Sequence, residues 1–273
     1  MIQERYDLVV VGAGIVGLAT AYEAQRRWPH LRLAVLDKEP AIAAHQSSHN
    51  SGVIHSGLYY APGSLKARTC VAGARLLMRF CDEYGLPYER CGKVIVATDE
   101  SEIPRLLELY RRGQANGVPG LELIGPDRLR AIEPAVVGRQ ALYSPNTGIV
   151  DFRRVAQTLA DLVQQAGGVI RLRHGVRQVR VQGSEVVLET TGGAIATRYA
   201  IACAGLHADR LARLSGGPVA PRIVPFRGDY YRLRPERAGL VRALIYPVPD
   251  PSFPFLGVHF TRRLDGEVWL GPN

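Results

Sequence analysis

The chain has 273 residues, of which 47% are apolar and 22% are charged, enough for one large domain or two interleaved domains with a buried core. It has no apolar run of about 18 residues or more, so no segment is predicted to span a bilayer. The formal net charge of +9 comes almost wholly from arginines spread along the chain, which argues against a nucleic-acid partner.

The N-terminus and the cysteines favour a reducing compartment. The first predicted strand begins without the basic, apolar and small-residue order of a signal peptide. The four cysteines lack CxxC pairs and histidines at ligand spacing, so we expect reduced thiols and no metal site. We predict a cytoplasmic protein, and the positive charge leaves peripheral association with the inner face of the cytoplasmic membrane open.

The first forty residues have the pattern of a dinucleotide-binding βαβ unit. An apolar run at 6–11 precedes GAGIVG at 12–17, an amphipathic stretch extends to Arg27, and a second apolar run covers 31–36. The two runs are predicted to pair as parallel strands.

The glycines of this unit have separate expected roles. Gly12 makes the tight turn, Gly14 lets a pyrophosphate approach the backbone, and Gly17 lets the helix pack on the strand. The helix N-terminus supplies N–H donors and a partial positive charge to phosphates. Asp37 ends the second strand, where a carboxylate accepts hydrogen bonds from an adenosine ribose.

An irregular stretch at 39–62, rich in His, Ser, Asn and Gly, follows and is expected to be functional because of its length. Helices are predicted at 65–84, 101–116 and 151–166, and strands at 93–98 and 169–172. An antiparallel meander is predicted with one strand over 176–191, a turn at Gly192 and Gly193, and a return strand over 194–202. Beyond Pro218 we expect short strands at 223–224, 229–233, 241–246, 256–261 and 268–270.

The later chain favours FAD over NAD. A nicotinamide-binding domain usually continues with further βαβ units, whereas here a polar loop and an inserted block follow the second strand. Strands then return, and the segment YAIACAG at 199–205 reads as a strand that ends in Ala-Gly.

The chain resembles the FAD-dependent oxidoreductases of the D-amino-acid oxidase type, in which the chain leaves the flavin domain and returns to it. Three long segments are similar to the L-2-hydroxyglutarate oxidase/dehydrogenase family: HNSGVIHSGLYYAPGSLKA (49–67), RGDYYRL (227–233) and YPVPDPSFPFLGVHFTRRLDGEVWLGPN (246–273). The resemblance covers essentially the whole chain.

The resemblance implies an α/β fold with two interleaved domains. A Rossmann-like FAD-binding domain would comprise residues 1–86 and 151–214. A substrate domain with a mixed, mainly antiparallel sheet would comprise residues 87–150 and 215–273.

The resemblance also implies a set of FAD-binding residues. For the ADP half these are Gly12, Gly14, Gly17, Asp37 and Lys38, and along the pyrophosphate and flavin they are Ser48, Asn50, Ser51, Gly52 and Val53. Val176 would contact adenine through its backbone, and a second close approach would be formed by Ala204, Gly205 and Leu206. We expect noncovalent FAD, because Cys70 lies in a helical pattern where a buried cysteine is a common core residue.

Oxidation of a 2-hydroxy acid requires a hydride to leave the α-carbon for the flavin and a proton to leave the hydroxyl. Histidine suits the role of proton acceptor because its pKa is near neutral. His55, in a glycine-flanked loop, is the first candidate and His259 the second. His49, a tyrosine, or no dedicated base stay open.

The substrate implied by the resemblance is L-2-hydroxyglutarate, which would be oxidised to 2-oxoglutarate. A dicarboxylate needs cationic or hydroxyl partners at both ends. The expected partners are Tyr59, Tyr60, Lys66, Arg227, Tyr230, Tyr231 and Arg262. Molecular oxygen and a membrane quinone are both open as electron acceptors.

Two alternatives accompany this interpretation. An amino-acid or glycine oxidase of the same fold would also act on an α-carbon beside a carboxylate. The chain ends at Asn273 inside a family motif, so we expect a C-terminal truncation, and the second alternative is a catalytically inactive FAD-binding fragment.

Overall fold

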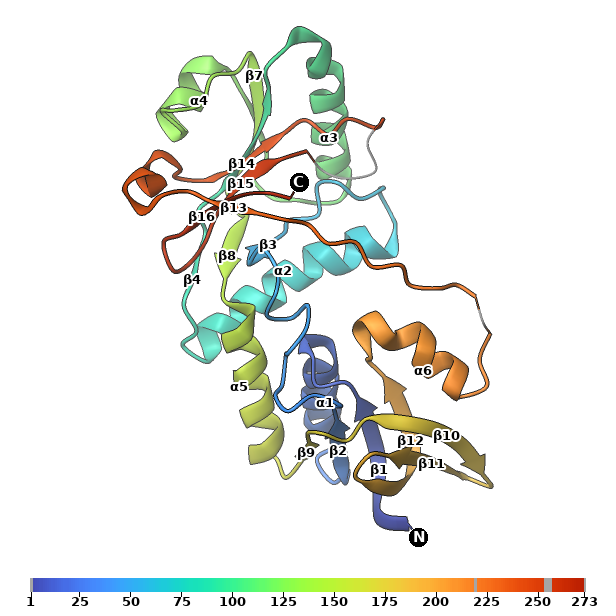
Figure 1. Cartoon of the computed structure of the whole chain (residues 1–273). Helices are drawn as coiled ribbons and strands as arrows, with labels where there is room; N and C mark the ends of the chain where they lie inside the picture. Colours follow the sequence, from blue (N-terminus) through green and yellow to red (C-terminus); the bar gives the residue numbers. More distant parts are fainter. Residues whose placement is uncertain (1, 219, 253–256, 273) are drawn as a thin grey trace. The chain divides into compact units, whose positions relative to one another are not determined.

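The computed structural model describes residues 2–218, 220–252 and 257–272. The chain forms two compact units, Met1–Asn50 with Phe152–Phe226 and Ser51–Asp151 with Arg227–Asn273 (Figure 1). The units are interleaved, and their boundaries differ from the expected ones because residues 51–86 group with the second unit and residues 215–226 with the first. The assignment of FAD to one domain and substrate to the other stays a prediction.

The first unit contains a six-stranded sheet in the order β10-β11-β12-β1-β2-β9. β1 (Ile2–Val11) pairs in parallel with β2 (Leu33–Leu36), as predicted, and also with β12 (Gly193–Ala202). On the far side of β2, β9 (Val169–Arg171) is parallel as well. The carboxyl ends of these parallel strands therefore meet at one edge, where such sheets bind ligands.

The antiparallel part of this sheet corrects one prediction. Residues 176–191 form two strands, β10 (Val176–Gln182) and β11 (Glu185–Thr190), and not one. Gly183 adopts a φ of +62° between them, a conformation that glycine enters without steric cost. The meander therefore has three strands, with β12 as the third.

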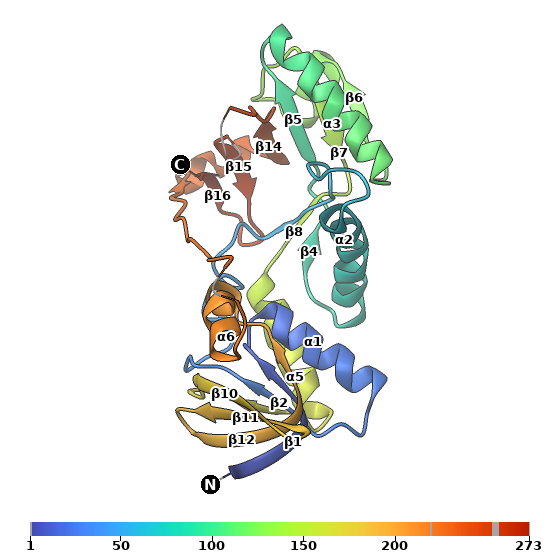
Figure 2. The same cartoon turned by 90° about the vertical axis from the view of Figure 1, so that its right-hand side faces the viewer.

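Helices α1 (Ile15–Arg27) and α5 (Phe152–Gln165) pack together on the same side of this sheet (Figure 2). The buried residues of α5 recur at helical spacing, so one face is apolar: Val155, Ala156, Leu159, Ala160 and Val163. The amide of Gln25, a buried side chain of α1, donates a hydrogen bond to the Ala166 carbonyl at 3.1 Å. A short helix that was not predicted, α6 (Ala208–Leu214), follows the 3₁₀ turn η2 (Gly205–His207).

The second unit contains a seven-stranded sheet in the order β13-β16-β15-β14-β5-β7-β6. Every neighbouring pair in it is antiparallel except β14 with β5, which confirms a mixed, mainly antiparallel sheet. The strands are β5 (Lys93–Ala97), β6 (Glu122–Ile124), β7 (Gln140–Ser144), β13 (Tyr231–Arg232), β14 (Leu244–Pro247), β15 (His259–Arg262) and β16 (Val268–Gly271).

A three-stranded antiparallel sheet completes the strands of this unit: β3 (Val53–Ile54), β8 (Gly148–Val150) and β4 (Tyr88–Glu89). Its helices are α2 (Leu65–Glu83), η1 (Glu100–Glu102), α3 (Ile103–Ala115), α4 (Pro126–Ile132) and η3 (Pro235–Leu240). Several elements of this unit were not predicted: β3, β4, β6, β7, β8, α4 and η3. The strand expected at 223–224 is wrong, and residue 256 of the strand expected at 256–261 lies outside the described residues.

The two faces of the seven-stranded sheet are covered by different helices. Successive strand residues point to opposite faces, so Lys93 and Ile95 share one face and Val94 the other. α3 packs on the face of Ile95, where Leu106 joins its apolar cluster, and α4 packs on the face of Val94. The Lys93 side chain therefore enters the interior of the unit from the middle of the sheet.

Candidate cofactor and substrate site

The glycine turn after β1 is packed so closely that no side chain fits at two of its positions. Gly12 has a φ of +119°, and a Cβ there would lie 2.2 Å from the Cys203 carbonyl oxygen. A Cβ on Gly17 would lie 1.8 Å from the Gly12 carbonyl oxygen. The turn after β1, the first turn of α1 and the end of β12 are thus held in backbone contact.

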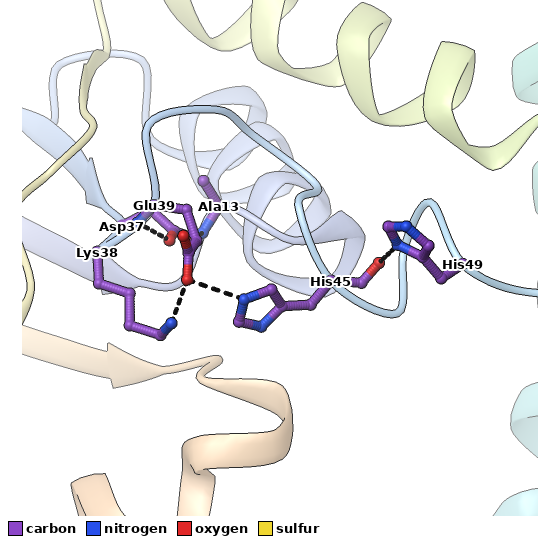
Figure 3. Close-up of polar contacts among 6 residues, drawn as sticks. All are labelled: Ala13, Asp37, Lys38, Glu39, His45 and His49. Atoms are coloured by element: carbon purple, nitrogen blue, oxygen red, sulfur yellow. Dashed lines mark hydrogen bonds and ion pairs between the residues drawn. The ribbon is translucent and has the colours of Figure 1, made fainter. Parts of the chain in front are cut away.

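The Asp37 carboxylate lies beside this turn (Figure 3). One oxygen accepts a hydrogen bond from the Ala13 N–H at 2.7 Å and the other from the Glu39 N–H at 2.9 Å. The acid predicted from its spacing therefore does reach the glycine turn. The neighbouring Lys38 is exposed and pairs with Glu39, which also contacts His45 Nε2 at 2.9 Å.

The N-terminus of α1 has a partner that sequence reasoning missed. The Ser47 hydroxyl accepts a hydrogen bond from the Ile15 N–H at 2.9 Å. Other N–H groups of a first helical turn have no partner within the helix, which makes this end suited to an anion. Ser47 lies in the irregular stretch, where no periodicity distinguishes it from Ser48.

The other predicted cofactor residues divide between the two units. Asn50 stabilises the loop by donating to the carbonyls of Gln46 and Ser47 at 2.9 and 3.0 Å. Ser48 lies in the same turn, whereas Ser51, Gly52 and Val53 belong to the second unit.

The segment that leads into β10 runs along the end of β2. The His174 N–H donates to the Asp37 carbonyl at 2.7 Å, which places Val176 two residues from this contact. At the end of β12, Ala204, Gly205 and Leu206 enter η2, where Gly205 has a φ of +51° and open space beside its Cα.

These features fit the ADP half of FAD. The glycines leave the backbone of the turn without side chains, so phosphates can approach it. The N–H groups of the first turn of α1 are available to them, and the Asp37 carboxylate lies beside the turn.

A second group of predicted residues gathers in the interior of the second unit around Lys93. Its side chain is 1% exposed, and its Nζ lies 4.0 Å from the ring centroid of Tyr246 and 5.3 Å from that of Tyr59. Within the described part of the chain, no carboxylate lies within ion-pair distance of this ammonium. Burial therefore lowers the pKa of Lys93 from 10.5 to about 7.

Both candidate histidines belong to this cluster. The His259 ring stacks on Tyr246 at 3.9 Å, and its Nδ1 lies 2.9 Å from the Gly257 carbonyl oxygen. Because a carbonyl only accepts, Nδ1 carries the proton in the neutral ring and Nε2 keeps its lone pair. Burial, followed by the charges of Lys93 and His259, lowers the pKa of His55 to about 3, so its ring is neutral at pH 7.

Hydroxyl groups complete the cluster. The hydroxyls of Ser56, Ser144 and Thr147 are buried and bond to one another at 3.0 to 3.3 Å. The Tyr59 hydroxyl is also buried but has no hydrogen-bond partner among the residues described. Burial raises the pKa of Tyr59 well above 10, so this phenol remains a donor at neutral pH.

The remaining predicted substrate residues stay predictions, and of these Tyr230 lies within electrostatic range of a cluster residue, Tyr246. Arg262 points to the opposite face of β15 from His259 and pairs with Glu89 at 2.6 Å. Arg227 pairs with Asp229 at 3.0 Å at the surface. The others are exposed: Tyr60, Lys66, Tyr230 and Tyr231.

Lys93 and Tyr246 were not singled out from the sequence. The available signal was a lysine at the head of the apolar run KVIVA, which predicts a strand buried on both faces. A charged residue in such a strand is expensive to bury, so its presence indicates a role.

Three further observations concern the residues that the structure describes. None of their helices has the length and apolar character needed to cross a membrane. They include no group of three or more His, Cys, Asp or Glu side chains placed to hold a metal ion. All four cysteines are free thiols.

The matching family model and the similar proteins point to the same family of enzymes. Residues 7–273 match the family model described as FAD dependent oxidoreductase. The chain is 50% identical over 280 residues to the mitochondrial L-2-hydroxyglutarate dehydrogenase of Homo sapiens, covering 98% of this chain and 60% of that protein. It is 46% identical over 269 residues to the L-2-hydroxyglutarate dehydrogenase of Indibacter alkaliphilus, covering 98% of this chain and 67% of that protein.

Solved structures show the same fold. L-α-glycerophosphate oxidase from Mycoplasma pneumoniae, with FAD bound, has a TM-score of 0.85 at 24% identity, covering 99% of this chain and 72% of that chain. Glycine oxidase from Geobacillus kaustophilus has a TM-score of 0.82 at 21% identity, with the same two coverages of 99% and 72%.

The matches confirm the predicted α/β fold and FAD as the cofactor of the family. The chain spans about 60% of the length of the human relative.

The glycine turn leads to a prediction with a matched control. Gly17→Ala should lower the free energy of unfolding by about 1–3 kcal/mol, because its methyl group overlaps the Gly12 carbonyl. Gly14→Ala should lower the free energy of unfolding less than Gly17→Ala, since only Ser47 Oγ, 3.2 Å from the added Cβ, would have to shift, yet it should weaken FAD retention. Urea unfolding and flavin absorbance after gel filtration measure the two effects. Equal urea midpoints for Gly17→Ala and the wild type would contradict this account.

The buried ammonium predicts an unusual dependence of stability on pH. Between pH 7 and 10.5 the unfolded chain binds more protons at Lys93 than the folded chain, so this residue's contribution to stability rises with pH. Lys93→Met should therefore be more stable than the wild type by a few kcal/mol, roughly, at pH 6 to 7. The difference should shrink by up to about 1.4 kcal/mol per pH unit above pH 7.

Urea unfolding of both proteins at pH 6, 7, 8 and 9 measures this difference. The difference reports Lys93 together with its electrostatic coupling to the titratable neighbours that both proteins share: His55, His259, Tyr59, Tyr246, Cys70 and Cys91. A stability difference that stays constant over this range would contradict the assignment of the ammonium as buried and unpaired.

Proposed function

Because the chain belongs to the FAD dependent oxidoreductase family, we propose that it serves the oxidation of L-2-hydroxyglutarate to 2-oxoglutarate. The identity of about 50% to L-2-hydroxyglutarate dehydrogenases supports this substrate. The observation that carries the proposal is the buried cluster in which two neutral histidines share their surroundings with an unpaired ammonium. Such a cluster offers a proton acceptor and an attraction for an anionic substrate.

FAD, when bound, supplies the acceptor for the hydride that leaves the α-carbon. The chain's own residues would take the hydroxyl proton. We propose His55 for this role, because its ring is neutral at pH 7 and has no hydrogen-bond partner in the described part of the chain. His259 is the second candidate, since the Gly257 carbonyl holds its ring with Nε2 free to accept.

The charge of the cluster favours a hydroxy acid over an amino acid. An amino-acid substrate carries an ammonium next to its α-carbon, and the buried Lys93 ammonium would repel it. A hydroxy acid carries only the carboxylate and the hydroxyl at the same positions. This argument places the amino-acid or glycine oxidase alternative second.

The electron acceptor and the location are linked in this proposal. Molecular oxygen would leave the protein free in the cytoplasm, whereas a membrane quinone would require peripheral association with the inner face of the cytoplasmic membrane. Detection of hydrogen peroxide during turnover would identify oxygen as the acceptor. Reduction of a short-chain quinone without peroxide would identify the quinone.

The function is tested by anaerobic reduction of the flavin in the FAD-loaded full chain. We expect L-2-hydroxyglutarate to bleach the flavin absorbance and glycine to leave it unchanged. His55→Ala should slow the bleaching by about 10²- to 10⁴-fold if its imidazole takes the proton. His30→Ala, an exposed histidine of the first unit, serves as the matched control and should have the wild-type rate.

Other outcomes separate the alternatives. Bleaching by amino acids alone would replace the proposal with the oxidase. A chain that retains flavin which neither hydroxy acids nor amino acids bleach would favour the inactive FAD-binding fragment. An unchanged rate for His55→Ala together with a slow His259→Ala would move the base to His259.

A further inference from the structure

The cluster around Lys93 contains donors without acceptors. The Lys93 ammonium has no hydrogen-bond partner among the residues described, and neither has the hydroxyl of Tyr59, whose ring centroid lies 5.3 Å from Nζ. Buried polar groups in folded proteins are normally paired, so two unpaired donors within one cluster call for an acceptor from outside the chain. Both donors favour the same kind of partner, an anion.

The aromatic rings do not balance the burial of this charge. Cation–π contacts with Tyr246 and Tyr59 hold the ammonium in place, at 4.0 and 5.3 Å from the ring centroids. The pKa of Lys93 nevertheless stays far below its ordinary value, so the charged form is still disfavoured. A carboxylate beside Nζ would reverse this, because an opposite charge favours the protonated amine.

The position of the cluster suits a substrate rather than a structural ion. Lys93 is on β5 in the middle of the sheet, and His259 and the ammonium each lie within about 4 Å of the same Tyr246 ring. His55 and Tyr59 are residues of intermediate exposure, although the Tyr59 hydroxyl itself is buried, so the cluster lies close to the surface of the unit. A small carboxylic acid held at Lys93 would lie within electrostatic range of His55, with the Tyr246 ring between it and His259.

We propose that Lys93 and the Tyr59 hydroxyl form the subsite that binds one carboxylate of the substrate. This inference rests on the proposed function for the identity of the substrate, whereas the subsite itself requires only a carboxylate. The ammonium supplies the charge, the phenol supplies a second hydrogen bond, and the Tyr246 ring orients the lysine. Lys93 is thus assigned as a substrate-binding residue that the comparisons do not identify.

The test uses glutarate, a five-carbon dicarboxylate that has no hydroxyl to oxidise. The chain has only three lysines, so ¹³C-lysine labelling of the full chain gives three side-chain Cε signals. The Lys93 signal is identified by its loss in Lys93→Met or, should that variant not fold, by elimination with Lys38→Arg and Lys66→Arg. We expect saturating glutarate to raise the titration midpoint of this signal by about 1 to 3 pH units.

Controls separate a charge effect from a general ligand effect. The uncharged analogue 1,5-pentanediol should leave the midpoint unchanged. Arg128→Met removes one positive charge from an exposed position of the same unit and should bind glutarate with the wild-type affinity in calorimetry. Tyr59→Phe should weaken glutarate binding about tenfold, because one hydrogen bond to a charged group is lost.

The outcomes distinguish this inference from the proposed function. A midpoint that does not move with saturating glutarate, or equal glutarate affinities for Lys93→Met and the wild type, would overturn the subsite. If glutarate raises the midpoint but no 2-hydroxy acid reduces the flavin, the subsite stands and the proposed function fails. If L-2-hydroxyglutarate reduces the flavin with the same KM in Lys93→Met, the function stands and the subsite fails.

Discussion

The nucleotide cradle depends on a backbone contact that leaves no room for a side chain. Gly17 lies against the Gly12 carbonyl, and Gly12 lies against the Cys203 carbonyl, so α1, β1 and the end of β12 meet without an intervening Cβ. Cys203 is about 190 residues distant from Gly12 in sequence, and the contact therefore joins the two segments of the first unit. The Asp37 carboxylate adds a hydrogen bond from β2 to the same turn.

The βαβ part of this unit could be predicted from the sequence because the residues that determine it lie close together in the chain. The order of apolar run, glycine turn, helix and acid identifies the parallel pair of β1 and β2 and the position of Asp37. Where the sequence pattern of an element is irregular or short, that element was predicted wrongly or not predicted at all. The hairpin turn at Gly183 was hidden in an alternating run, and α6 is too short to show helical periodicity.

The second unit is harder to predict because its site is assembled from distant segments. His55 comes from a loop, Lys93 from β5, and Tyr246 and His259 from β14 and β15, and no spacing in the sequence brings them together. His55 and His259 were found through the family resemblance. Lys93 was not, because a lysine at the start of a strand is ordinarily an exposed residue, and only the pairing of β5 between β7 and β14 buries it.

The buried lysine and the histidines form one electrostatic unit. Burial is the largest cause of the low pKa of His55 and of His259, and the positive charge of Lys93 lowers both pKa values further, so both imidazoles are neutral at pH 7. A neutral imidazole can accept a proton, but one with so low a pKa is a weak base. A carboxylate bound at Lys93 would offset this charge and raise the histidine pKa values toward neutrality. The base would then gain strength only when an anionic substrate is in place, and a ligand without a carboxylate would leave it weak.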